Sequence, residues 1–142
     1  MRVPIERTRR GYPALWESGG GYTNTGRATI IAAADGNPKK DVYVRRRGHL
    51  ACGQHALVII EPGDYVIRAE HHRGDFTISV LEIVAIDEKT ALLQERYSFD
   101  NSEWSDDPPE HLHPAIRAAR EKARCYHCRS AHFVQQPDHV AP

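Results

Sequence analysis

The stretch that decides the fold is Phe76-Thr-Ile-Ser-Val-Leu-Glu-Ile-Val-Ala-Ile86, near the middle of the 142-residue chain. β-Branched side chains dominate it, and apolar and polar residues partly alternate, as on a strand with one buried face. We therefore predict a strand over 76–86. The turn cluster at 73–75 and the polar run at 87–90 bound it on either side.

Five further stretches of the same character surround this strand. The turn residues at 61–64 predict that two of them, 56–60 and 65–68, are strands joined by a tight turn. Hydrophobic residues make up 40% of the chain, enough for a core at this length. We predict an α+β fold built on a small antiparallel β-barrel or sandwich of about six strands. The five stretches are 28–33, 41–46, 56–60, 65–68 and 91–97.

The remaining segments have their own patterns. Residues 1–26 mix basic side chains, prolines and three successive glycines, which predicts an irregular basic arm. Residues 99–110 hold acids and no Lys or Arg, which predicts a linker, and Pro114 followed by good helix formers predicts a C-terminal helix over 115–124. We assign 27–134 to one domain and 135–142 to a disordered tail.

Two pairs of metal-ligating residues share the same spacing. Cys52-Gly-Gln-His55 supplies a thiolate and an imidazole, and Cys125-Tyr-His-Cys128 supplies two more thiolates. Two ligands separated by two residues are typical of a structural Zn²⁺ site, which takes four ligands at tetrahedral corners. Together the pairs use all three cysteines of the chain. We predict that one Zn²⁺ clips the C-terminal helix onto the sheet.

Alternatives to this zinc site remain open at the level of sequence. Cys52 could be a small buried residue, with Cys125 and Cys128 forming a redox dithiol. Three nearby histidines could replace His55 as the fourth ligand. Four protein ligands leave no position for water, so the predicted site is structural and not catalytic. The three histidines are His49, His127 and His132.

Charge and termini limit the classes of partner. Lys plus Arg and Asp plus Glu both number 19, so the net charge gives no general attraction to nucleic acid or to an anionic membrane. The first residues lack a secretory signal and no run is long enough to span a bilayer. We expect a cytoplasmic protein without a membrane partner, where cysteines stay reduced.

Arginines nevertheless gather at three places, one of them near the N-terminus at Arg7, Arg9 and Arg10. Arginine beside aromatic rings is a common way to hold single-stranded nucleic acid, through phosphate contacts and base stacking. The alternative to nucleic-acid binding is that these arginines form a solvated basic face. The residues that we expect to bind RNA or single-stranded DNA are Tyr22, Tyr43, Arg45, Arg46, Arg47, Arg117, Arg120 and Arg124.

Two further stretches resemble functional motifs only weakly. Residues 21–28 have the glycine spacing of a phosphate-binding loop, but they lack its lysine and its Ser or Thr, and a strand is expected to follow. His71 and His72 are adjacent on a predicted strand, where they point to opposite faces and cannot chelate one ion, and we expect both to be exposed.

Three functional hypotheses follow. The leading one is a non-enzymatic zinc-binding domain that recognises a macromolecule, with RNA or single-stranded DNA ahead of other ligands. The second is a protein-interaction or assembly subunit with a structural zinc, which would form a homo-oligomer or bind a protein partner. The third is a zinc-dependent hydrolase with Glu70 or Asp75 as base, which requires an open zinc coordination position.

Overall fold

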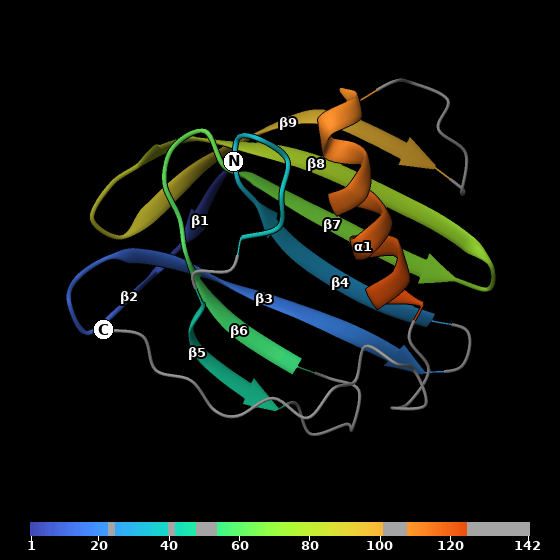
Figure 1. The fold of residues 1–142 in the computed structure, drawn as a ribbon, viewed down its shortest axis with the longest axis horizontal. Helices are drawn as coiled ribbons and strands as arrows, with labels where there is room; N and C mark the ends of the chain where they lie inside the picture. The colour runs from blue at the N-terminus through green and yellow to red at the C-terminus, as the bar shows by residue number, and fades with distance from the viewer. Residues whose placement is uncertain (23–24, 40–41, 48–53, 101–107, 125–142) are drawn as a thin grey trace.

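One antiparallel β-sheet carries a single α-helix on one of its faces (Figure 1). The computed structural model describes residues 1–22, 25–39, 42–47, 54–100 and 108–124. Over these ranges the chain forms nine strands, a short 3₁₀ helix and one α-helix. They are β1 (Arg2–Pro4), β2 (Glu6–Arg7), β3 (Pro13–Tyr22), β4 (Thr25–Ala32), β5 (Val42–Arg47), β6 (Gln54–Ile59), β7 (Tyr65–His72), β8 (Asp75–Ile86), β9 (Thr90–Asp100), η1 (Glu110–Leu112) and α1 (His113–Ala123).

The N-terminal strands connect β9 with β3 across the curved sheet. The strand order is β1-β9-β8-β7-β4-β3-β6-β5, and β2 pairs with β3. In consecutive strands, Val3 lies opposite Ala91 on β9, and Glu6 lies opposite Ala14 on β3. The sheet is therefore nearly closed and barrel-like. The predicted antiparallel barrel with a C-terminal helix is confirmed at this level, while its clipping by zinc stays a prediction.

Apolar side chains fill both sides of the sheet. Neighbouring residues of a strand point to opposite faces, so Ile30 and Ile67 pack beneath α1 while Ile31 and Val66 pack on the other side, together with residues of β6, β8 and β9. This explains the nearly continuous apolar runs in β4 and β8, which a sheet buried on one face only would not require.

Helix α1 covers β4 and β7 (Figure 1). Pro114 lies in its first turn, and Ala115, Ile116, Ala119 and Ala123 are buried against the sheet, so the predicted helix is confirmed. Small alanines allow the helix backbone to approach the strands closely. No described helix is long and apolar enough to cross a membrane.

A tight turn at Gly36 and an ion pair just after it stabilise the loop that follows β4. Gly36 has a φ of +91°, and a Cβ at this position would collide with the backbone carbonyl of His111, so only glycine fits there without strain. Just beyond this turn, the Nζ of Lys39 lies 2.8 Å from the Oδ2 of Asp64, and both side chains are buried. Asp64 also accepts the Glu61 N–H, so its charge is compensated twice.

The N-terminal segment differs from the prediction of an irregular arm. Residues 2–22 form β1, β2 and β3 and belong to the main sheet. Gly19 of β3 allows close packing, because a Cβ at this position would lie 2.7 Å from Cδ of Lys122 on α1. Glycine is unfavourable in strands, so the sequence argued against a strand here. The missing side chain nevertheless allows α1 to lie close to β3.

The predicted tight turn between the strands 56–60 and 65–68 is confirmed, but the two strands do not pair with each other. β6 pairs with β3 and β5, whereas β7 pairs with β4 and β8. The pattern within a strand predicts its buried face and not its partner, so the chain can cross from one half of the sheet to the other here. The glycine-spaced stretch 21–28 lies largely in strands, where Gly21 pairs with Gly26.

Candidate nucleic-acid interface

The exposed side of α1 presents three arginines around a hollow. Arg117, Arg120 and Arg124 are three and four residues apart, so they lie on one side of the helix, next to the buried alanines. Together with Glu121 they line a cavity of about 210 Å³. The sequence predicted these arginines as binding residues, and the structure brings them together.

Phe76, at the start of β8, is the platform for two of these arginines. The guanidinium carbon of Arg120 lies 4.9 Å from the centroid of its ring, and that of Arg124 lies 5.0 Å away. Such cation–π contacts contribute about 0.5–2 kcal/mol each, more where water is excluded. Phe76 is only 1% exposed, so its ring has a fixed position. The arginine heads are therefore held in place before any ligand arrives.

The electrostatics of this surface favour an anion. Burial lowers the pKa of Arg120, and the neighbouring charges of Arg124 and Arg117 lower it further. Among the described residues that line the hollow, three guanidinium groups outnumber the one carboxylate, that of Glu121. A bound phosphate would reduce the repulsion between the arginines and accept hydrogen bonds from them.

His71 lies beneath the same cluster, contrary to the expectation that it is exposed. Its ring centroid is 4.9 Å from that of Phe76, and the side chain is 4% exposed, whereas its neighbour His72 is exposed. The Gly74 N–H donates to its Nε2 over 3.2 Å. Burial, followed by the charge of Arg124, lowers the pKa of His71. The alternation of the strand was predicted correctly, but the face covered by α1 was not.

The predicted arginines on β5 are not neighbours of this cluster in the sheet. β5 is an edge strand, and four strands separate it from β8, which carries Phe76. The backbone of Arg46 pairs with that of His55, but the side chains of Tyr22, Tyr43 and Arg45 to Arg47 lie outside the described part of the structure. The predicted convergence of both arginine groups on one face therefore stays a prediction.

Arg7 has a structural task. Its Nη2 donates to the backbone carbonyls of Asp87 (2.9 Å) and Glu88 (3.2 Å), and its Nη1 donates to that of Gly11 (2.8 Å). These bonds hold the N-terminal strands to the turn between β8 and β9. The guanidinium of Arg7 therefore stabilises the fold itself.

The predicted zinc ligands are only partly described. Cys52, Cys125 and Cys128 lie outside the described residues, while His55 is exposed at the start of β6, with its ring centroid 6.4 Å from that of Trp16. Within the described ranges no three His, Cys, Asp or Glu side chains are grouped to hold a metal ion. The zinc site stays a prediction.

The described residues next to the two half-sites lie at the same end of the sheet. Gln54, two residues after Cys52, pairs with Gly19 on β3. Gly19 is the residue against which Lys122 of α1 packs, and α1 ends just before Cys125. His55 and the next residue of β6, Ala56, point to opposite faces of the sheet.

Comparisons with known proteins give no relative. No family model matches the chain, and neither the curated proteins nor the solved structures contain a match. The side chains of this protein are therefore the source of functional information. Among these, sequence reasoning missed Phe76 as the platform, because the arginines that contact it lie more than 40 residues away along the chain.

Proposed function

We propose that the protein is a non-enzymatic zinc-binding domain that binds single-stranded nucleic acid, RNA or DNA, through the arginine surface of α1. The observation that carries the proposal is the pair of guanidinium groups held over the buried ring of Phe76. A guanidinium that lies over an aromatic ring can form paired hydrogen bonds with phosphate oxygens through the N–H groups at its edge. Arg117 adds a third charge at the same hollow.

The size of the surface fits an extended strand better than a deep-bound ligand. The hollow is about 210 Å³, and the described residues that line it all carry charged side chains. Small-molecule sites are usually larger and mainly apolar. A phosphate backbone supplies repeated anions to an exposed cationic surface and needs no enclosure.

The test is oligonucleotide binding with charge-matched variants. Fluorescence anisotropy of a labelled oligo(U) or oligo(dT) of about 12 nucleotides reports the affinity. The variant Arg117→Gln/Arg124→Gln should bind at least about tenfold more weakly than wild type, because two charged hydrogen-bond donors are lost. The control Arg10→Gln/Arg27→Gln removes the same charge from an exposed loop and from β4, and it should bind like wild type. Equal losses in both variants would contradict the proposal.

In this proposal zinc has an architectural role. Cys52, His55, Cys125 and Cys128 would hold the ion in a reducing cytoplasm, and the bound metal would stabilise the end of α1 that carries Arg124. The purified protein should contain one zinc per chain, and Cys52→Ser and Cys128→Ser should both lose it and unfold at lower temperature. A stable wild-type protein that contains no metal would contradict this part alone.

A further inference from the structure

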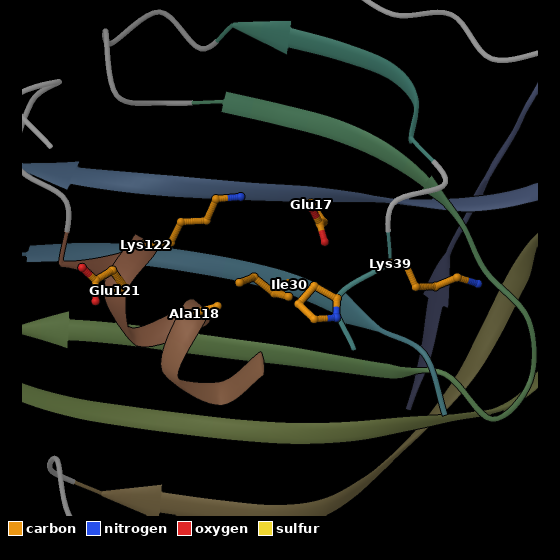
Figure 2. A pocket seen from close by; sticks show the side chains of 7 residues that line it. Glu17, Ile30, Lys39, Ala118, Glu121 and Lys122 are labelled. Atoms are coloured by element: carbon orange, nitrogen blue, oxygen red, sulfur yellow. The ribbon is translucent and has the colours of Figure 1, made fainter. Parts of the chain in front are cut away.

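A second cavity lies under the C-terminal half of α1, where two strands of the sheet separate. The pairing of β3 with β4 ends at Ser18 opposite Thr29. Beyond this pair a space of about 270 Å³ opens between the strands, bounded by α1 and by the segment after β4 (Figure 2). The phosphate contacts proposed for the arginines leave this cavity unused.

Helix α1 brings the cavity next to the arginine hollow. Arg117 lines the hollow, and the following residue, Ala118, lines the cavity. Glu121, one turn further along the helix, lines both. A helical turn advances about 5.4 Å along the axis, so the two spaces meet within a single turn of α1. A strand with a phosphate at the hollow therefore has a neighbouring sugar and base within reach of the cavity.

The shape and lining of the cavity suit a flat ring. Ile30, which is 5% exposed, forms its floor, and Ala118 borders it from the helix (Figure 2). Lys39 adds its methylene groups, because its ammonium is bound to Asp64 and points away from the cavity (Figure 2). The volume is just below the about 300 Å³ at which sites for whole small molecules begin. The cavity therefore has room for one heterocyclic ring system and not for a complete nucleotide.

We infer that the cavity takes one base of the single strand that binds to the arginine surface. The inference rests on the proposed function, because it requires a strand at the hollow. The face of the base would lie against Ile30 and Ala118, and its sugar would pass Glu121 to a phosphate at the arginines. Bases of a single strand can turn out of the strand into a pocket, whereas those of a duplex must first unpair and unstack. The cavity thus favours single strands over a double helix.

The first test separates the base from the phosphate. Fluorescence anisotropy compares wild-type binding of labelled oligo(dT) of about 12 nucleotides with binding of an abasic strand of equal length, which keeps every phosphate. Oligo(dT) should bind at least about fivefold more tightly, the lower end of what one held base contributes. Both strands should show the same salt dependence, since their phosphate contacts are the same. Equal affinities would overturn this inference alone, whereas no binding of either strand would overturn the proposed function with it.

Two variants assign the base contact to the cavity. Ala118→Leu fills the cavity and should bind oligo(dT) only as tightly as wild type binds the abasic strand, with its affinity for the abasic strand unchanged. Ala85→Leu, the same change at an exposed position on β8, is the matched control and should keep the wild-type difference between the strands. If Ala118→Leu also keeps that difference, the base is bound elsewhere and the inference is overturned.

Amide shifts of the isotope-labelled wild-type protein test the same claim without a substitution. The Ile31 N–H donates to Oε2 of Glu17 over 2.9 Å, and the Lys39 N–H donates to the Ile31 carbonyl over 2.8 Å, so both amides lie beside the cavity. Both should shift with oligo(dT) and not with the abasic strand, whereas the amide of Arg117 should shift with either strand. Shifts at Ile31 and Lys39 that are the same with the two strands would contradict the inference.

Discussion

Neutralising a single arginine of α1 should change how strongly salt weakens oligonucleotide binding. Arg117, Arg120 and Arg124 can each neutralise one phosphate at the hollow. For a single strand the slope of log affinity against log salt is about −0.7 per phosphate, so three contacts give about −2.1. Raising the salt from about 50 to about 200 mM should then weaken binding about 20-fold. In Arg124→Gln the slope should fall to about −1.4 and the loss to about 7-fold.

Anisotropy titrations at four or more salt concentrations measure both slopes. The change of slope is a sharper test than the change of affinity, because a fold defect lowers the affinity without removing a fixed number of released ions. Arg10→Gln should keep the wild-type slope. The reasoning would be refuted by a wild-type slope near zero, or by a slope in Arg124→Gln equal to that of wild type.

Three further predictions concern stability, measured as the free energy of unfolding in urea. Gly36→Ala should destabilise by about 2 kcal/mol or more, because the positive φ and the carbonyl of His111 both exclude a Cβ; an unchanged midpoint would disprove the close approach. Lys39→Met should cost about 3–5 kcal/mol by leaving the charge of Asp64 buried without its partner, and adding Asp64→Asn should recover part of this loss; no recovery would show that packing dominates. Burial lowers the pKa of His71 below its ordinary value of about 6.5, so the unfolded state binds more protons and stability should fall as the pH drops through that range. His71→Gln should flatten this dependence, and a dependence equal to that of wild type would contradict the assignment.

The sequence predicted most of the sheet because strands β4 to β9 follow apolar patterns with clear turns. The stretch 76–86 forms β8, Asp75–Ile86, and the turn before it contains Arg73 and Gly74, both with positive φ. The N-terminal strands were missed because pairing with β9 and β3 stabilises them, and that pairing depends on residues about 90 positions away in the case of β1. Local sequence contains no record of such partners.

The sequence predicted the charged residues of the candidate site but not the buried ring that lies beneath them. The spacing of Arg117, Arg120 and Arg124 on a helix could be counted directly in the sequence. That Phe76 lies under two of them depends on which face of β8 the helix covers. His71 was expected on the surface for the same reason, since alternation separates two faces but does not show which one a helix will bury.

The cavity between β3 and β4 depends even more on tertiary structure. It arises because the pairing of β3 with β4 ends at Ser18 and Thr29, an event that no residue pattern marks. Glu17 then serves as a hydrogen-bond acceptor for Ile31 on the other strand. From sequence alone Glu17 is one acid among many, so neither its position nor its task could have been predicted.

The measurement that tests the central claim most directly is a map of the bound oligonucleotide on the protein. Amide shifts of the isotope-labelled protein are recorded during titration with oligo(U). The account predicts the largest changes at Arg117, Arg120 and Arg124 and at Phe76 beneath them. Changes concentrated on β5 or on the N-terminal strands, with α1 unaffected, would contradict it.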